Sequence, residues 1–315
     1  YHSDITDEES FLPLDFGNAQ FMPDPSRGLG KNEDNEIIVF GAFSTEYFVN
    51  RGSENFAFQR LNQKAQKIGI LGTQCKSELS GKWYTISRRK ETSASFHIIS
   101  LGSEQAISSR ETDQVLATYS PDALSTSTVD TMMIDNVEFV IYHLPNHTFV
   151  FNQTIAETLG IDKAWSILKS DVLGDNTYRG KNLLLDPRNG KWTIGDKSSS
   201  TIGYLDRSTC TQYGDISEWI LYTPFVNMET LSINKLEIET IPGIAPDNDA
   251  TVAVSITQDG RTYSKEYWNL YGTNLDYGQR FYLRNLGYVR DWIGFKFRGA
   301  SRARMAFSNL DVEAS

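Results

Sequence analysis

A β-hairpin pattern that recurs four times constrains the fold of this chain more than any other feature. Each copy is a short run of β-branched and aromatic residues, a polar connection, and a second run of the same kind. The copies begin at Ile37, Trp83, Val137 and Trp192, so successive starts are separated by 46, 54 and 55 residues. Small antiparallel sheets at a period of about 40–50 residues are typical of β-propeller blades. The pattern predicts four blades, with an irregular β-sandwich as the alternative.

The rest of the chain divides around these repeats. Residues 1–36 are rich in Asp, Glu, Pro and Gly, so we expect an irregular N-terminal arm before the blades at 37–227. After residue 228 the pattern changes, and residues 252–257 lead into Asp259-Gly260, a strong hairpin signal. We expect residues 228–315 to form a C-terminal antiparallel β-sandwich, which makes the whole chain all-β.

Helical periodicity is nearly absent. Aromatic residues make up 12% of the chain, which favours strands over helices. Residues 152–162 could hold one or two helical turns.

Charge and composition exclude several classes of protein. The formal net charge of −10 argues against a free, sequence-independent DNA-binding protein, which needs a positive field to displace phosphate counterions. Cys75 and Cys210 have no Cys or His at metal-ligand spacing, and two lone thiols indicate a reducing compartment. The sequence shows neither a membrane-spanning apolar run nor a signal peptide. Because the first residue is Tyr1 and not Met, we expect a processed or shortened chain.

Motifs for enzyme chemistry are missing from the sequence. It contains no Gly-rich phosphate loop, dinucleotide fingerprint or Gly-x-Ser-x-Gly elbow. His143 and His147 are four residues apart, but Pro145 between them breaks any helix that could aim both rings at one metal. We therefore predict no catalytic residue, no cofactor and no metal site.

Two features could still suggest a carbohydrate-active propeller. Residues 257–263 look like a degenerate copy of the Asp motif that sialidases repeat, but we interpret them as a hairpin turn. Paired carboxylates could hydrolyse a glycoside. Most of the candidates fall at strand ends or turns, where Asp commonly accepts backbone hydrogen bonds: Asp130, Asp135, Glu138, Asp186, Asp196, Asp206 and Asp215.

A basic and aromatic cluster near the C-terminus is the best candidate for a contact surface. Arg and aromatic residues are enriched at protein–protein hot spots, and the overall negative charge favours a protein partner, or internal Arg–acid pairs, over nucleic acid. The candidate partner-contact residues are Arg284, Arg290, Trp292, Arg298, Arg302 and Arg304. Strand alternation would place only half of such side chains on any one face.

Several strings carry a family resemblance. They are FVIYHLPNHTFVF at 139–151, KWTIGD at 191–196, EWILYTP at 218–224, SITQDGRTYSKEYW at 255–268, RNLG at 284–287 and GFKFRGASRARMAF at 294–307. In this order they resemble the packaged-DNA stabilization proteins that form the tail hub of P22-like short-tailed phages. The resemblance covers the chain from about residue 37 to its end, and corresponds to the C-terminal two-thirds of such proteins.

The resemblance implies a non-enzymatic protein of the virion tail, made in the bacterial host cytoplasm. It implies a ring, most simply a homo-hexamer, whose partners are the portal adaptor protein, the tail needle and the tailspike. Its role would be to close the channel and retain packaged DNA, without a membrane and without sequence-specific nucleic-acid binding. Two alternatives stay open at this stage: a sialidase-like glycoside hydrolase, marked by convergent Arg and paired carboxylates, and a sugar-binding module, marked by exposed Tyr and Trp platforms.

Overall fold

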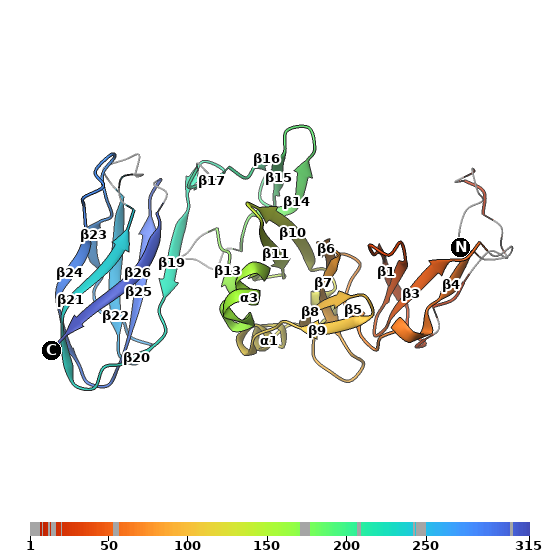
Figure 1. Cartoon of the computed structure of the whole chain (residues 1–315), viewed down its shortest axis with the longest axis horizontal. Coiled ribbons are helices and arrows are strands. Elements are labelled where there is room, and N and C mark those ends of the chain that lie inside the picture. Colours follow the sequence, from red (N-terminus) through yellow and green to blue (C-terminus); the bar gives the residue numbers. More distant parts are fainter. Residues whose placement is uncertain are drawn as a thin grey trace. The chain divides into compact units, whose positions relative to one another are not determined.

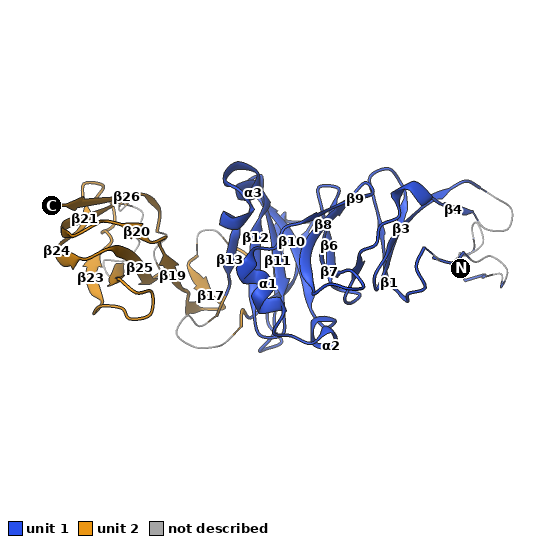
Figure 2. Cartoon of the chain, turned by 90° about the horizontal axis from the view of Figure 1, so that it is seen from below, with its two compact units in different colours: residues 1–168, 179–202 blue, residues 169–178, 203–315 orange. Residues whose placement is uncertain are grey.

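The computed structural model describes residues 7, 9–11, 13, 17–19, 21–52, 57–170, 177–206, 209–241, 243, 250–302 and 305–315. The chain forms two compact units (Figure 2). Unit 1 comprises residues 1–168 and 179–202, and unit 2 comprises residues 169–178 and 203–315. Within the described part of the chain, no helix has the length and hydropathy needed to cross a membrane.

Unit 1 begins with two antiparallel sheets (Figure 1). The first sheet has the order β1-β2-β3-β4, with bounds Ser26–Lys31, Ile37–Gly41, Thr45–Asn50 and Phe58–Arg60. In the second sheet β5-β7-β8-β9 are neighbours and β6 also pairs with β7; the bounds of β5 to β9 are Gly69–Ile70, Lys76–Leu79, Lys82–Arg88, Ser95–Ser100 and Ser103–Ala106.

Two further sheets follow along the chain. The third sheet has the order β10-β11-β12-β13, with bounds Thr128–Ile134, Val137–His143, Thr148–Asn152 and Trp165–Ile167. The fourth has the order β14-β15-β16, with bounds Gly180–Asp186, Lys191–Asp196 and Ile202–Tyr204. The short strands β17 (Thr211–Gln212) and β18 (Asp215–Ile216) pair with each other in unit 2.

The four predicted hairpins are confirmed. They are β2–β3, β7–β8, β11–β12 and β15–β16. Each sheet runs mainly as a meander, the connection expected of a propeller blade. The predicted irregular arm at 1–36 is wrong in one part, because β1 at Ser26–Lys31 pairs with β2 and belongs to the first sheet.

The cores of unit 1 lie between sheets. Ile38, Phe40 and Tyr47 of the first sheet pack with Ile70 and Ile99 of the second. A larger cluster joins the second and third sheets, and it contains Tyr84, Ile86, Phe96, Val140, Tyr142, Phe149 and Phe151. Because each cluster takes side chains from two sheets, each of the first three sheets buries its apolar residues against a neighbouring sheet.

Polar contacts hold the fourth sheet to the third. The Asp130 carboxylate on β10 accepts hydrogen bonds from His143 Nε2 (3.0 Å) and from the backbone N–H of Asn182 on β14 (2.8 Å). On the other side of the imidazole, Lys197 Nζ lies 3.4 Å from His143 Nδ1. The Trp192 indole N–H donates to the carbonyl of Met133 (3.1 Å). Strands β10, β11, β14 and the β15–β16 turn thus share one polar junction.

Within the described ranges, short α-helices and 3₁₀-helices interrupt the sheets. The helices are α1 (Arg110–Leu116), α2 (Pro121–Leu124), α3 (Gln153–Leu159), η1 (Asn62–Lys64) and η2 (Ile161–Lys163). Helix α3 confirms the turns expected at 152–162, and the Asn152 side chain caps it by accepting from the Ile155 N–H. Helix α1 begins at a capping box formed by Ser109 and Thr112. The sequence pattern had not indicated α1 or α2.

Unit 2 contains a two-sheet antiparallel sandwich (Figure 1). The larger sandwich sheet has the order β19-β25-β22-β23, and β20 also pairs with β25; β19, β20, β22, β23 and β25 span Glu218–Tyr222, Val226–Asn227, Thr251–Thr257, Tyr267–Leu270 and Trp292–Ala300. The smaller sandwich sheet has the order β24-β21-β26, with bounds Phe281–Val289, Leu231–Thr240 and Phe307–Ala314. Their buried faces share one core that includes Ile233, Leu236, Val254, Phe281 and Phe297.

Strand pairing in the sandwich differs from the sequence expectation at two points. The expected limit between blades and sandwich, at 227/228, falls too late because β19 and β20 pair with β25. The hairpin expected around Asp259-Gly260 is present, but its second strand is β23 at Tyr267–Leu270 and does not begin at residue 262.

Candidate partner-binding surface on the sandwich

The predicted partner-contact residues do not form one cluster. Arg284 lies on β24 in the smaller sandwich sheet, whereas Arg298 lies on β25 in the larger one. Trp292 is the first residue of β25 and is 50% exposed. Arg290 and Arg302 are exposed next to the ends of β24 and β25, and Arg304 lies outside the described residues. The two sheets therefore separate side chains that are close in sequence.

The outer face of the larger sheet follows from strand alternation. Ile293, Phe295 and Phe297 of β25 point into the buried core, so Lys296 and Arg298 point outward. In the register of this sheet, Arg298 lies opposite Ala253 of β22, and Ala253 lies opposite Trp268 of β23. The small Ala253 side chain leaves room for the arginine to reach across to the tryptophan.

Aromatic rings and cations alternate on this outer face. The Arg298 guanidinium carbon lies 5.4 Å from the centroid of the Trp268 ring, and Lys296 Nζ lies 5.5 Å from that of Tyr263. The rings of Tyr263 and Tyr222 meet edge to face at 6.1 Å. We call Tyr222, Tyr263, Trp268, Lys296 and Arg298 the aromatic–cation face. Tyr222 is 57% exposed and Trp268 49% exposed, so much of this face is open to a partner.

The chemistry of this face suits a protein partner better than a sugar. A sugar-binding platform needs ring faces that are free for stacking, but Trp268 and Tyr263 each have a cation over the ring. The Glu266 carboxylate lies 3.4 Å from Arg298 Nε and forms an ion pair with the arginine. Partial burial raises the pKa of the Tyr263 hydroxyl, which stays neutral. Held aromatic and Arg side chains of this kind are enriched at protein–protein hot spots.

The opposite outer face, on the smaller sheet, is an ion-pair network. Lys235 Nζ lies 2.7 Å from Glu237 and 3.2 Å from Glu313, and Arg280 also pairs with Glu237. Hydrogen bonds with Glu237 and Glu313 raise the pKa of Lys235, and the bond from Lys235 lowers that of Glu237. Arg284 lies 5.1 Å from the Tyr282 ring centroid.

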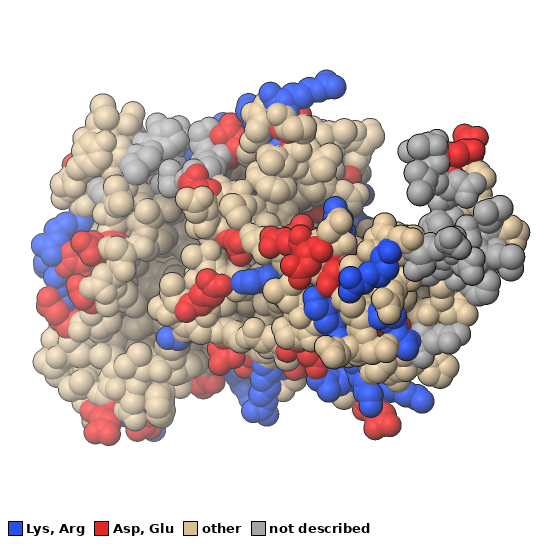
Figure 3. Space-filling model, turned by 45° about the vertical axis from the view of Figure 1, so that its right-hand side comes forward, with Lys and Arg blue, Asp and Glu red and all other residues tan. Residues whose placement is uncertain are grey.

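On the face of the molecule that Figure 3 displays, acidic and basic side chains are interspersed.

Both parts of the chain match family models of one phage protein. Residues 1–210 match the model described as bacteriophage P22 Gp10, beta-propeller. Residues 218–315 match the model described as bacteriophage P22 Gp10, beta-sandwich. The chain belongs to the bacteriophage P22 Gp10 family. The predicted fold class, a β-propeller followed by a β-sandwich, is thereby confirmed, as is the family resemblance read from the sequence.

Among curated proteins, this family member is similar to the tail hub protein gp10 of Salmonella phage P22. The two are 28% identical over 315 residues, which covers 98% of this chain and 65% of the relative. The chain therefore spans slightly less than two thirds of the length of the relative that it matches.

Solved structures of glycoside hydrolases show only a faint likeness to this Gp10-family chain. An engineered family 43 enzyme with endo-xylanase and exo-arabinofuranosidase activity has 8% identity and a TM-score of 0.29, covering 94% of this chain and 88% of the other. An exo-β-1,3-galactanase from Phanerochaete chrysosporium has 10% identity and a TM-score of 0.21, covering 92% and 68%. TM-scores this low carry no argument about fold or function.

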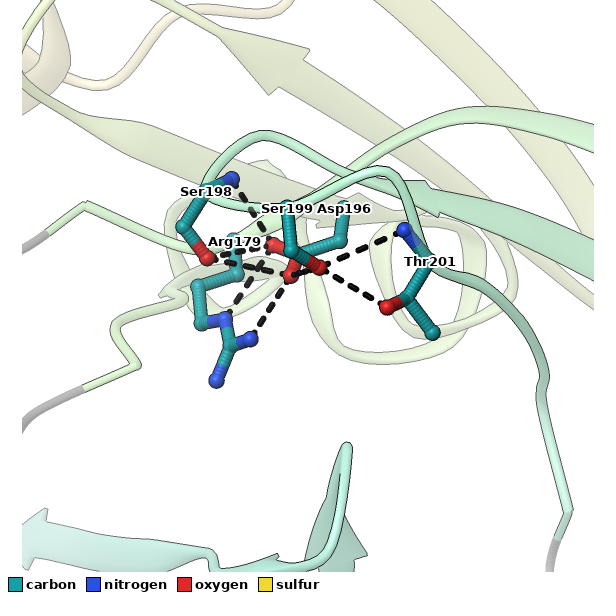
Figure 4. Close-up of polar contacts among 5 residues, drawn as sticks. All are labelled: Arg179, Asp196, Ser198, Ser199 and Thr201. Carbon is teal, nitrogen blue, oxygen red and sulfur yellow. Dashed lines mark hydrogen bonds and ion pairs between the residues drawn. The ribbon is translucent and has the colours of Figure 1, made fainter.

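The carboxylates considered for glycoside chemistry have structural partners. Figure 4 shows Asp196 accepting from Arg179 Nε (3.1 Å) and Nη2 (2.6 Å), and from the hydroxyls of Ser198 (2.8 Å) and Ser199 (2.6 Å). These donors, with Arg179 first, hold the pKa of Asp196 well below its usual range. Because it is locked as an acceptor, this carboxylate orders the β15–β16 turn and is unsuited to donating a proton.

Asp259 serves the turn after β22 in the same way. Its carboxylate accepts from the N–H groups of Arg261 (2.9 Å) and Thr262 (2.8 Å) and from the hydroxyls of Thr257 (3.1 Å) and Thr262 (2.6 Å). The Thr262 bonds, the largest effect, lower the pKa of Asp259 well below its usual range. The hairpin-turn interpretation of residues 257–263 is therefore confirmed.

Proposed function

We propose that this chain is a structural component of a phage tail hub that works by docking onto other protein chains. The observation that carries the proposal is the 28% identity to a tail hub protein along 98% of this chain. That likeness extends through both the blades and the sandwich, each of which matches its own family model. A protein of this kind belongs in the virion tail and assembles after synthesis in the host cytoplasm.

The partners that we propose are the portal adaptor protein, the tail needle and the tailspike. In this role the chain forms a homo-hexameric ring, closes the channel and retains packaged DNA, without catalysis. Meander sheets joined by shared cores make a stiff support, which suits a connector under load. Ring closure needs heterologous contacts repeated around an axis, and loops at blade ends are suited to such contacts.

The aromatic–cation face is our candidate for one of these contacts. It includes Arg298, one of the residues selected from the sequence, and adds Tyr222, Tyr263, Trp268 and Lys296. Large rings held by neighbouring cations lose little conformational entropy when a partner covers them. The opposite face of the sandwich, where charges are already paired, offers less to gain from burial.

The test is a mass measurement on the purified chain, alone and mixed with portal–adaptor complexes of the same phage. The proposal predicts a discrete complex that contains several copies of the chain. In this assay, Trp268→Ala weakens assembly by at least about tenfold, as expected for a hot-spot aromatic. Tyr288→Ala is the matched control, because Tyr288 is 54% exposed on a strand of the smaller sheet.

Two results would contradict the proposal. If the chain forms no complex at micromolar concentration, the docking role is wrong. If it forms one that responds equally to both substitutions, the aromatic–cation face is not the contact, and another surface must serve.

A further inference from the structure

The two long sides of the sandwich are built differently. On one side, β23 of the larger sheet and β24 of the smaller sheet meet, and the Asn269 side-chain amide donates to the carbonyl of Tyr282 (2.8 Å). On the other side, β19 and β26 border a pocket of about 350 Å³. Both are the outermost strands of their sheets. One side is closed by a hydrogen bond, and the other opens toward the core.

The open side is lined mainly by apolar side chains. We call it the β19–β26 groove, and its apolar lining consists of Trp219, Leu221, Ile238, Phe297, Phe307 and Leu310. Leu221 is 51% exposed and Phe307 is 37% exposed, although both belong to the inward-facing set of their strands. A cavity of about 150 Å³ holds one benzene-sized group, so the groove has room for two apolar side chains.

The walls of the groove are held in shape without an occupant. The Trp219 ring lies 5.2 Å from the Phe307 ring, which links the two edges. An ideal Cβ on Gly299 would lie 2.6 Å from Trp219, so this glycine lets the indole lie flat against β25. A preformed apolar groove orders few groups when it is filled, which favours binding.

The edges offer backbone groups as well as side chains. An edge strand presents a row of N–H and C=O groups on its outer side, and an extended peptide can pair with them. A strand that pairs with β26 or β19 would project every second side chain toward the groove. Apolar side chains at positions i and i+2 of the added strand would then fill the groove, which has room for two.

The residues that line the groove are uncharged, so the charge of the two edge strands is what favours particular flanks on the occupant. Strand β26, with the sequence FSNLDVEA, contains Asp311 and Glu313 and no Lys or Arg. Strand β19, with the sequence EWILY, adds Glu218 and also has no basic residue. Glu313 is paired with Lys235, and Asp311 is exposed and accepts a hydrogen bond from the Asn309 side-chain amide (3.0 Å). Because Leu310 and Val312 pack on the core, both carboxylates lie on the outward face of β26, where an added strand would place its own outward side chains beside them. Lys or Arg residues at the ends of an added strand would complement these carboxylates.

We propose that the β19–β26 groove binds one extended segment of a partner protein, with apolar side chains at i and i+2 and Lys or Arg on its flanks. The segment adds a strand to the edge of the sandwich and completes its core. This inference rests on the sandwich alone and holds whether or not the chain is a tail-hub component.

A designed peptide tests the proposal without any virion protein. The probe is a ten-residue peptide that alternates Leu and Thr between terminal Lys pairs, titrated calorimetrically into the full chain. Three comparison peptides replace the Lys residues by Glu, replace the Leu residues by Thr, or place the Leu residues side by side. We expect the alternating Lys peptide to bind at least about tenfold tighter than each of them.

Two variants locate the binding site. Leu221→Asn removes an apolar wall of the groove and should weaken binding by at least about tenfold. Leu184→Asn is the matched control: Leu184 is 68% exposed on a strand of unit 1, so its replacement should change binding by less than about twofold. Hydrogen exchange should slow in β19 or β26 on binding and stay unchanged in β23 and β24.

Each contrary result overturns the proposal. These are no binding at about millimolar peptide, equal binding of the Lys and Glu peptides, equal effects of the two substitutions, or protection confined to β23 and β24. Concentration-dependent dimers that Leu221→Asn abolishes would assign the groove to a second copy of the chain and would equally reject a basic partner segment.

Discussion

The two units bury their hydrophobic side chains in different ways. In unit 1 each core cluster is shared: Ile38 and Phe40 of the first sheet pack against Ile70 of the second, and Phe96 of the second against Tyr142 of the third. In unit 2 one core, from Ile233 to Phe297, is closed by the two sheets of a single sandwich. A blade therefore depends on its neighbours, whereas the sandwich carries its own hydrophobic core.

This difference has a consequence for binding. The coupled blades form a stiff support, because an opening in one sheet exposes the core of the next. The sandwich buries its core between its own two sheets, so its outer faces and its open edge are not needed for the core and can bind partners. It carries both the aromatic–cation face and the β19–β26 groove.

The largest expected effect comes from separating the units. We expect a fragment of residues 217–315 to fold with one cooperative transition, because the whole of its core cluster lies within these residues. A fragment of residues 26–60, the first sheet alone, should stay unfolded, because its apolar face packs on the second sheet. Circular dichroism and denaturant unfolding of both fragments check this. A stably folded first sheet would break the comparison.

The second effect is the truncation of one shared core residue. Phe96→Ala removes a fully buried ring that lies 4.2 Å from the Tyr142 ring and 4.9 Å from the Trp165 ring in the neighbouring sheet. It should destabilise unit 1 by about 3–5 kcal/mol and leave the sandwich unchanged. Phe297→Ala should do the reverse. Denaturant unfolding, followed by hydrogen exchange in each unit, distinguishes the two; equal loss in both units would show that they unfold together.

The third effect is a dependence of folding stability on pH, through histidine titration, that is confined to unit 1. The four histidines, His2, His97, His143 and His147, all precede residue 169, so unit 2 contains none. Burial, the leading cause, lowers the pKa of His97 and of His143. A histidine kept neutral in this way adds stability above its unfolded pKa of about 6.5 and loses it as the pH falls, because the unfolded chain then binds the proton more readily.

Between pH 7 and pH 5, unit 1 should therefore lose up to about 1.4 kcal/mol per pH unit for each of these histidines, while the sandwich is not affected by this mechanism. Scanning calorimetry at both pH values measures it. The His97→Gln/His143→Gln double variant should have a flatter profile than the unsubstituted chain. An unchanged slope would assign the acid sensitivity to other groups.

The smallest effect compares the two Asp-centred turns. Asp196→Ala removes the bonds to Arg179 and to two serines, and Asp259→Ala removes only bonds within its own turn. Because Arg179 lies outside the β15–β16 turn, Asp196→Ala should lower the unfolding midpoint of unit 1 more than Asp259→Ala lowers that of the sandwich. Thermal scans of the two variants decide the order. The reverse order would show that Arg179 adds little to its turn.

Sequence patterns predicted the elements that local chemistry determines. The strands before and after Pro145-Asn146, and the turn at Asp259-Gly260, are determined by residues near in sequence, and the structure contains them. Strand β1 was not predicted because its sequence, SRGLGK, has almost no β-propensity. Its glycines are explained by tertiary packing: an ideal Cβ on Gly30 would lie 2.5 Å from the Trp83 ring. Helix α1 was not predicted because its seven residues are too few to show a helical period of apolar side chains.

The candidate site was only partly predictable for a topological reason. Only Arg290 and Asp291 separate β24 from β25. A connection this short predicts a hairpin, yet the two strands belong to different sheets. Arg284 and Arg298 therefore face opposite sides of the sandwich. Tyr222 reaches the same face as Arg298 because it pairs with Lys296, 74 positions away. Trp268 reaches it because Trp268 and Arg298 both pair with Ala253, which lies 15 and 45 positions away from them.

The central claim is that this chain acts by docking protein partners onto a stiff β scaffold through the aromatic–cation face. Hydrogen exchange measured on the chain alone and in complex with the portal–adaptor assembly tests it most directly. The account predicts slower exchange at residues 263–268 and 296–298 in the complex, with little change at residues 232–237 on the opposite face. Protection of residues 232–237 with unchanged exchange at 263–268 and 296–298 would contradict it.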